Sequence, residues 1–190
     1  MKIVTVSGTL DNSKRFPKFW KNLEDSFAKY FPKARFVLHT DFYFPWETDK
    51  MRNYGEELLS LYDDGEDIIL LGHSIGGVIA TIIAPKFKKS KVKLLVTLNS
   101  PHKLESLYEK IDRSFKMDKV KIPIASFSSI LDPIVPFFMA KHPKSNIHDF
   151  FIAEHVTTFI FFPKLCDRIA ETSFLVFKNP KKKFEDKIKA

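Results

Sequence analysis

The chain has 190 residues, 31 of them basic and 23 acidic, and this length fits one compact domain. The hydrophobic share of 44% excludes a disordered chain, and the net charge of +8 is spread too evenly along the chain to indicate a nucleic-acid partner. The single cysteine, Cys166, excludes a disulfide scaffold and a cysteine-ligated zinc site, and it indicates a reducing compartment, which we expect to be the cytoplasm.

Short apolar runs rich in β-branched residues predict the strands of the fold. These runs are mostly continuous rather than alternating, which is typical of strands that are buried on both faces. The predicted strands cover Ile3–Val6, Arg35–His39, Asp67–Leu71, Val92–Leu98 and Ile122–Phe127. The first segment turns polar too early for a secretory signal, and no apolar run approaches the roughly 20 residues of a transmembrane helix.

Segments with helical periodicity lie between these strands. In the first, apolar residues recur at three- and four-residue steps from Phe16 to Tyr30, and Pro17 suits the first turn of a helix. Further helices are predicted over about residues 49–62, 75–88, 103–115 and 163–174. The alternation predicts a doubly wound α/β fold, with a mostly parallel sheet of about six strands covered by helices on both faces.

We predict a single domain over residues 1–178, followed by a Lys-rich C-terminal tail over residues 179–190. The only concentrated run of lysines lies where the two meet, from Lys178 to Lys183, and acidic residues soon dilute it. A solvated terminus is therefore preferred over a binding tail.

The junction that is most informative about function follows the third predicted strand and reads Gly72-His73-Ser74-Ile75-Gly76. A buried strand, a Gly-x-Ser-x-Gly pattern and a helix in succession are typical of a serine nucleophile on a strained turn. The amides at the start of the helix point to where an oxyanion would form. A plain glycine turn that leads into a helix is the alternative, and no phosphate-binding glycine pattern occurs in the sequence.

A serine nucleophile needs a base, and the base needs an acid, in the order Ser, Asp or Glu, His along the chain. Asp132 follows the strand that ends at Phe127, which is where such an acid belongs, although an Asp-Pro pair also favours turns. His142, His148 and His155 come after it. His155 is preferred as the base because it precedes the last helical segment, whereas His148 is expected in a loop.

These motifs resemble those of the α/β-hydrolase superfamily, specifically its small lid-less lipase and esterase type. The matching elements are Gly-His-Ser-Ile-Gly, Leu98-Asn99-Ser100-Pro101-His102, Leu131-Asp132-Pro133-Ile134-Val135-Pro136 and Glu154-His155-Val156. The second is similar to the Leu-Gly-Thr-Pro-His element of many lipases, and the four occur in order over most of the chain. The resemblance implies Ser74 as nucleophile, Asp132 as acid and His155 as base, with no metal and no organic cofactor.

The resemblance also implies an oxyanion hole made by backbone amides. In the family, one donor comes from a loop that follows an early strand and begins His-Gly, and the corresponding segment here is Ser7-Gly8-Thr9. Serine replaces the histidine, but the donor is a backbone N–H, so we assign the amides of Thr9 and Ile75 to the hole.

Aromatic loops follow two of the predicted strands and are expected to border the cleft. Phe44, Trp46 and Phe137 would suit an acyl chain or an apolar leaving group, and core packing is the alternative. The leading function is a serine carboxylesterase or lipase that acts on a small-molecule acyl ester. Two alternatives stay open: an acyl thioesterase with the same triad, and a non-catalytic protein that binds a lipid, a membrane surface or a partner through its Phe-rich, Lys-flanked face.

Overall fold

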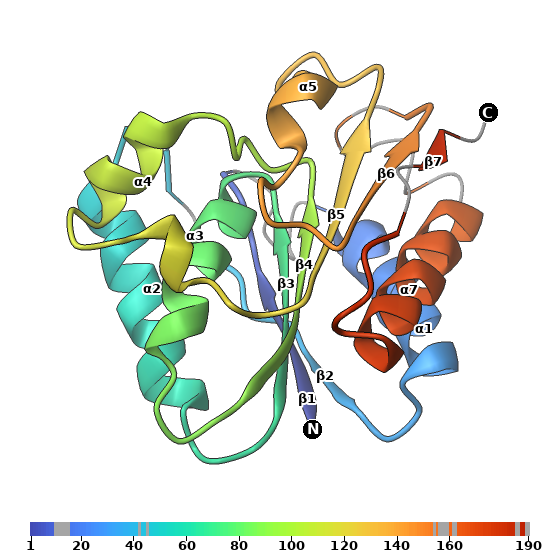
Figure 1. The fold of residues 1–190 in the computed structure, drawn as a ribbon, viewed down its shortest axis with the longest axis horizontal. Helices are drawn as coiled ribbons and strands as arrows, with labels where there is room; N and C mark the ends of the chain where they lie inside the picture. The colour runs from blue at the N-terminus through green and yellow to red at the C-terminus, as the bar shows by residue number, and fades with distance from the viewer. Residues whose placement is uncertain are drawn as a thin grey trace.

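The computed structural model is built around one sheet of parallel strands, drawn as arrows in Figure 1. It describes residues 1–9, 16–41, 43–44, 46–153, 155, 160, 163–184 and 187–188. The strands are β1 (Lys2–Val6), β2 (Arg35–Val37), β3 (Ile68–His73), β4 (Val92–Leu98), β5 (Ile124–Ser129), β6 (Ile147–Phe151) and β7 (Lys187–Ile188). Their order is β2-β1-β3-β4-β5-β6-β7, and every neighbouring pair is parallel. The predicted doubly wound α/β class is confirmed.

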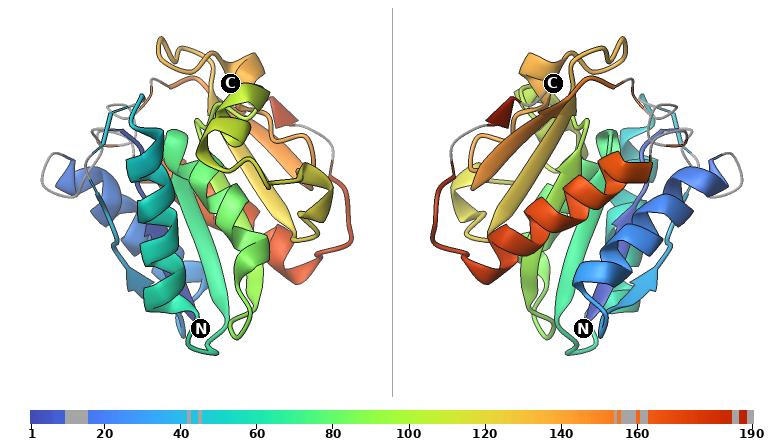
Figure 2. Two further views of the ribbon diagram at one scale, coloured as in Figure 1. Left: turned by 90° about the vertical axis from the view of Figure 1, so that its left-hand side faces the viewer. Right: turned by 90° about the vertical axis from the view of Figure 1, so that its right-hand side faces the viewer.

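Helices cover both faces of this sheet, as Figure 2 shows. Helices α1 and α7 lie against one face, and α2, α3 and α4 lie against the other. The helices are α1 (Pro17–Tyr30), α2 (Thr48–Tyr62), α3 (Ile75–Ile83), α4 (Glu105–Ile111), α5 (Phe137–Ala140) and α7 (Pro163–Lys178). Short 3-10 turns occupy Ala84–Lys86 and Met117–Lys119.

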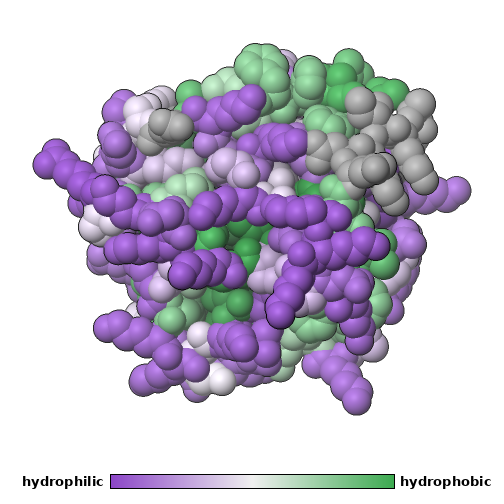
Figure 3. Space-filling model, viewed as in Figure 1, coloured by the Kyte–Doolittle hydropathy of each residue, from purple (hydrophilic) through white to green (hydrophobic). Residues whose placement is uncertain are grey.

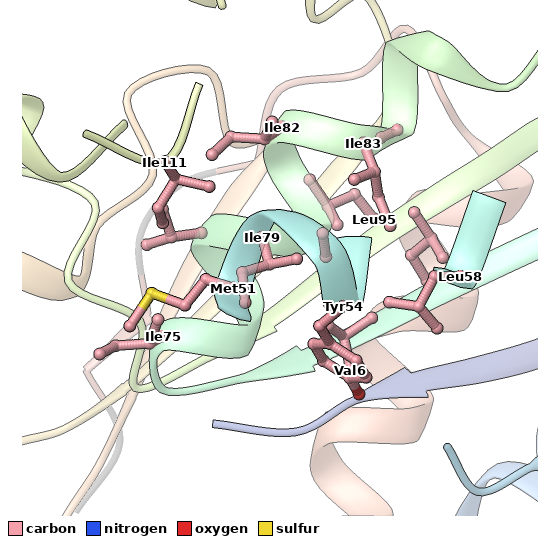
Figure 4. Packing of buried hydrophobic residues seen from close by; sticks show 14 of the residues in the cluster. Val6, Met51, Tyr54, Leu58, Ile75, Ile79, Ile82, Ile83, Leu95 and Ile111 are labelled. Atoms are coloured by element: carbon pink, nitrogen blue, oxygen red, sulfur yellow. The ribbon is translucent and has the colours of Figure 1, made fainter. Parts of the chain in front are cut away.

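The central strands are buried on both faces, as their continuous apolar runs predicted. In β1, Ile3 packs in the core under α1 and α7, whereas Val4 and Val6 pack in the core under α2 and α3. Figure 4 shows this second core, in which Met51 of α2 and Ile79 of α3 are fully buried or nearly so. Burying one such side chain stabilises the fold by about 1.5–3 kcal/mol, so the two cores fix the sheet between the helix layers.

Helix α1 begins as predicted and also supports the candidate site. Pro17 lies in its first turn, and its buried face includes Phe19, Trp20 and Phe27. The Phe19 ring lies 5.0 Å from the ring of His73, the residue that precedes Ser74. The face of α1 that packs in the core therefore also holds the end of β3 in place.

Helix α3 is shorter than the sequence predicted. It was expected to reach about Lys88, but it ends at Ile83 and continues as a 3-10 turn over Ala84–Lys86. The reason is Pro85, which lacks the amide N–H that would bond to a carbonyl oxygen one turn earlier.

Strand β6 was not predicted, and His148, which was expected in a loop, lies within it. Two polar side chains interrupt its apolar pattern, but both are buried with partners. His148 Nε2 lies 2.8 Å from Ser128 Oγ on β5, and Asp149 accepts a hydrogen bond of 2.9 Å from Arg168 Nε on α7. Because these partners come from distant parts of the chain, the local pattern did not indicate a strand.

The described part of the Lys-rich segment is joined to the sheet by hydrogen bonds. The Asn146 side chain donates to the carbonyl oxygens of Pro180 and Lys182, at 3.0 and 2.9 Å, and Phe184 N–H donates to Asn146 O at 2.8 Å. Strand β7 then pairs with β6. Among the residues that the structure describes, no helix has both the length and the apolar character to cross a membrane.

Candidate active site

The turn between β3 and α3 holds Ser74 in a conformation that few non-glycine residues adopt. Its φ of 54° and ψ of −132° make it one of two described non-glycine residues with positive φ. A Cβ at Gly72 would lie 2.7 Å from Gly77 N, and one at Gly76 would overlap the carbonyl oxygen of Val6. The glycines of the motif therefore allow α3 to pack directly on its own strand and on β1.

The loop after β1 lies directly against Ser74. A Cβ at Gly8 would be 2.6 Å from Ser74 Cβ and 3.3 Å from Ser74 Oγ. Ser7 is held firmly, because Tyr43 OH donates to its carbonyl oxygen at 2.5 Å and its own N–H donates to Tyr54 OH at 3.2 Å. This brings Thr9, the expected oxyanion donor, next to the nucleophile turn.

The second expected donor, the amide of Ile75, lies in the first turn of α3. Amides of a first helical turn have no carbonyl oxygen one turn earlier to bond, and they carry the positive end of the helix dipole. The two amides expected to form the oxyanion hole thus belong to two different segments. Thr9 lies in the loop after β1, and Ile75 directly follows Ser74 at the start of α3.

Asp132 and His155, the expected acid and base, form a pair in which the Asp132 side chain is fully buried and that of His155 is 12% exposed. His155 Nδ1–H donates to Asp132 Oδ2 at 2.6 Å, and Asp132 Oδ1 accepts from the amides of Ile134 and Val135 at 2.8 and 2.9 Å. Burial opposes the charge of Asp132, but these hydrogen bonds, the one from His155 foremost, hold its pKa below the usual value. Asp132 is therefore an ionised carboxylate with both oxygens engaged, and it fixes the proton of His155 on Nδ1.

His155 lies beside the serine turn as well as beside Asp132. Its ring centroid is 4.7 Å from that of His73, and its carbonyl oxygen is 3.2 Å from His73 Nε2 and 3.0 Å from Asn99 Nδ2. Asp132 and His155 therefore lie together beside the turn that carries Ser74, at the carboxyl edge of β3, β4 and β5.

The other histidines have different surroundings. His102 and His142 are buried against each other, with ring centroids 4.5 Å apart, and His102 Nδ1 lies 2.6 Å from Tyr108 OH. Burial lowers the pKa of His142 to about 3 and that of His102 well below the usual value, so both are neutral near pH 7. Among the three histidines that follow Asp132, it is His155 that bonds to it.

The aromatic residues expected at the cleft lie at the surface rather than in the core. Trp46 is 74% exposed and stacks on Phe44 with ring centroids 4.8 Å apart, and Phe137 is 41% exposed. Most large apolar side chains with high exposure follow the carboxyl ends of strands, namely Leu38, Phe44, Trp46, Leu104, Ile130, Leu131, Ile134, Phe137, Phe138 and Ile152. Figure 3 shows apolar residues gathered along the upper edge of the molecule, where Figure 1 has α5.

A second candidate site elsewhere in the described residues would be either a surface depression or a group of metal-binding side chains. One surface depression, of about 1090 Å³, lies between α2 and α4 and is lined mainly by charged residues such as Arg52 and Lys110, with none of the candidates. Within the described ranges, no group of three or more His, Cys, Asp or Glu side chains has the geometry of a metal site.

Comparison with known proteins agrees with this architecture. Residues 50–120 match the model of the family described as PGAP1-like alpha/beta domain. A search of curated protein sequences gave no match. Among solved structures, an extracellular alpha/beta-hydrolase from a Paenibacillus species is similar over 91% of this chain and 98% of its own, with a TM-score of 0.61 and 14% identity. The chain has the α/β-hydrolase fold.

Two further structures extend the likeness. A point variant of SOBER1 from Arabidopsis thaliana is similar over 91% of this chain and 99% of its own, with a TM-score of 0.65 and 12% identity. The esterase domain of a Rhodothermus marinus protein is similar over 91% and 87%, with a TM-score of 0.53 and 18% identity. The resemblance inferred from the motifs is therefore confirmed at the level of the α/β-hydrolase fold.

Proposed function

We propose that this α/β-hydrolase-fold chain is a serine hydrolase that cleaves carboxylic esters. The observation that carries the proposal is the 2.6 Å hydrogen bond between Asp132 and His155 beside the strained Ser74 turn. A buried carboxylate that bonds one nitrogen of an imidazole beside a serine is the arrangement with which serine hydrolases carry out acyl transfer.

The first half of the proposed reaction makes the acyl-enzyme. His155 carries its proton on Nδ1 toward Asp132, so Nε2 carries the lone pair that accepts the Ser74 hydroxyl proton. Ser74 Oγ bonds to the acyl carbon, and the ester C–O bond breaks as His155 returns the proton to the leaving alcohol. Asp132 stays ionised and stabilises the transient imidazolium.

The second half releases the acid. Water gives a proton to His155 and attacks the acyl carbon, and Ser74 Oγ leaves and regains that proton. In both halves the amides of Thr9 and Ile75 would hold the negative oxygen of the tetrahedral intermediate. This role is supported by the contact of the adjacent Gly8 with Ser74 and by the place of Ile75 directly after Ser74.

The surface around Ser74 favours an ester with an apolar part. Exposed Phe44 and Trp46 follow β2 and Phe137 follows β5, so they lie at the same carboxyl edge of the sheet as the three candidates. Apolar walls with a few polar groups are typical of small-molecule sites. The same triad would also cleave thioesters, so a thioesterase is the second candidate. The esterase domain reported above is consistent with the first.

The test is hydrolysis of a series of p-nitrophenyl esters, from acetate to laurate, by the wild type and by Ser74→Ala. We expect turnover by the wild type that falls to the background rate in Ser74→Ala, and matched oxygen and sulfur esters then separate esterase from thioesterase. Ser114→Ala, which changes an exposed serine far from the turn, is the matched control and should retain full activity. A folded wild type that hydrolyses neither class would contradict the proposal and favour the non-catalytic binding protein.

A further inference from the structure

Asn99, at the carboxyl end of β4, combines full burial with an unusual backbone conformation. Its φ is 49°, and it is the second described non-glycine residue, beside Ser74, with a positive φ. Asparagine adopts this region more readily than most residues, and glycine adopts it without strain. The similar lipase element, Leu-Gly-Thr-Pro-His, has glycine at this position, so the side-chain amide is what this sequence has in addition.

That amide joins the two segments that carry the acid and the base. Asn99 Oδ1 accepts the Ser129 N–H at 2.8 Å, and Asn99 Nδ2 donates to the His155 carbonyl oxygen at 3.0 Å. Ser129 ends β5 and in turn accepts the N–H of Asp132 at 3.3 Å. One buried side chain therefore bonds both to the turn of Asp132 and to the backbone of His155.

Leu98, the residue before Asn99, adds a contact to the Ser74 turn. The carbonyl oxygen of Leu98 accepts the Ser74 N–H at 2.8 Å. The dipeptide Leu98-Asn99 thus touches all three segments that bring Ser74, Asp132 and His155 together.

We propose that Asn99 is a positioning residue of the active site, whose amide holds the Asp132–His155 pair in register with Ser74. The inference rests on the proposed function, because the relative position of these side chains matters for activity only if the three residues react together. A displacement of about 1 Å in a reacting group costs about 10² in rate, so a loss of this amide should appear in turnover rather than in substrate binding.

Two substitutions separate the amide from the backbone conformation. Asn99→Gly retains the positive φ and removes both hydrogen bonds, and we expect kcat to fall about 10- to 100-fold with KM nearly unchanged. Asn99→Asp retains the oxygen that accepts the Ser129 N–H. It replaces the Nδ2 donor by a second oxygen, which cannot donate to the His155 carbonyl oxygen while the carboxyl group is ionised. A protonated carboxyl group can donate there again, so the ratio of kcat for Asn99→Asp to kcat for Asn99→Gly should rise as the pH falls.

Asn146 provides a matched structural control at the opposite end of the sheet. It is also buried, and its side chain accepts the Ile124 N–H at 2.9 Å and donates to two carbonyl oxygens of the Lys-rich segment. Asn146→Ala removes a similar set of bonds, so it should lower the melting temperature without lowering kcat.

Proton NMR of the hydrogen-bonded His155 Nδ1–H gives a readout that does not depend on turnover. We expect its downfield signal to persist in Asn146→Ala and to shift or broaden in Asn99→Gly. An active wild type with an equally active Asn99→Gly and an unchanged signal would overturn this inference alone. An inactive wild type would contradict the proposed function, while the NMR comparison would still decide whether Asn99 positions His155.

Discussion

At the level of single residues, the Ser74 turn depends on backbones that approach too closely for any side chain. Gly8 is the case that touches Ser74 itself, because a Cβ there would lie 2.6 Å from Ser74 Cβ and 2.8 Å from the His73 carbonyl oxygen. These are backbone and short side-chain atoms that cannot turn away. A larger residue at this position must therefore displace the loop that carries Thr9.

We predict that Gly8→Ala lowers kcat/KM by about 10²–10³, the usual cost of losing one oxyanion donor. The fold should persist, because Gly8 lies outside the strands, after the end of β1 at Val6. Ester hydrolysis and a thermal melt of the same preparation check both statements. Undiminished hydrolysis by Gly8→Ala would remove this loop from the oxyanion hole.

Asp132 gives a prediction about pH and stability. Its pKa in the folded chain lies below the usual 3.8, so its ionised form stabilises the fold above that value, and the contribution is lost as the pH falls through the folded pKa. Asp132→Asn should therefore be less stable than the wild type at pH 7 by up to about 2 kcal/mol, the scale of a hydrogen bond to a charged group. Urea denaturation at pH 7 and at progressively lower pH measures the gap, and a gap that does not close once the pH lies below the folded pKa of Asp132 would contradict the account.

The residues of the candidate site differ in how much the sequence revealed about them. Ser74 was predicted because its glycine spacing is a local pattern, and the order of Asp132 and His155 along the chain supported their selection. Asn99 was missed, because its role depends on contacts with segments 30 and 56 residues away. The one available signal was that asparagine stands where the similar lipase element has glycine.

At the level of elements, prediction succeeded where one periodic pattern spans a whole segment. The three- and four-residue steps found α1, and the continuous apolar runs found β3 and β4. Strand β6 was missed because His148 and Asp149 are satisfied only by side chains from β5 and α7. The end of α3 was misjudged because Phe87 extends the apolar pattern past Pro85, where the helix stops.

The connection between α3 and β4 is fixed by one carboxylate at the end of α2. Asp63 accepts hydrogen bonds from the amides of Lys88, Lys89 and Ser90 at 3.0, 2.8 and 2.7 Å. These bonds, the one from Ser90 foremost, lower the pKa of Asp63 from its usual 3.8. Its contribution to stability is therefore present above that value and lost as the pH falls through the folded pKa.

We predict that Asp63→Ala lowers the melting temperature at pH 7 and that the difference from the wild type closes in acid. Thermal melts of both proteins across this pH range measure the effect. Esterase activity should be unchanged, because the connection lies at the amino edge of the sheet. An equal difference at all pH values would show that the charge is not what holds the connection.

At the level of the whole molecule, charge and apolar surface are segregated. Lysines that are far apart in sequence line two adjoining depressions, of about 780 and 370 Å³, and no acidic residue among those described lines either one. These lysines are Lys88, Lys89, Lys91, Lys93, Lys119, Lys121, Lys144, Lys181 and Lys183. Figure 3 shows hydrophilic side chains around an apolar floor on the face in view. Most exposed large apolar residues, in contrast, follow the carboxyl ends of strands, the edge of the sheet where Ser74 also lies.

This segregation predicts a cost in stability from repulsion between lysines. Neither Lys91 nor Lys121 forms an ion pair within the described part of the chain, so Lys91→Gln with Lys121→Gln should raise the melting temperature at low ionic strength. The gain should vanish near 1 M salt, where the Debye length is about 3 Å. Lys21 and Lys29 are the matched control, because each pairs with an aspartate at 2.7 Å. An equal gain from Lys21→Gln with Lys29→Gln would refute the explanation.

The central claim is that Ser74 is a nucleophile activated by His155 and Asp132, and labelling with a fluorophosphonate tests it most directly. The reagent bonds covalently to an activated serine, and tandem mass spectrometry locates the modified residue. We predict modification of Ser74 in the folded wild type, much slower modification in His155→Ala, and none after heat denaturation. A folded wild type that is not modified, or is modified at another serine, would contradict the account.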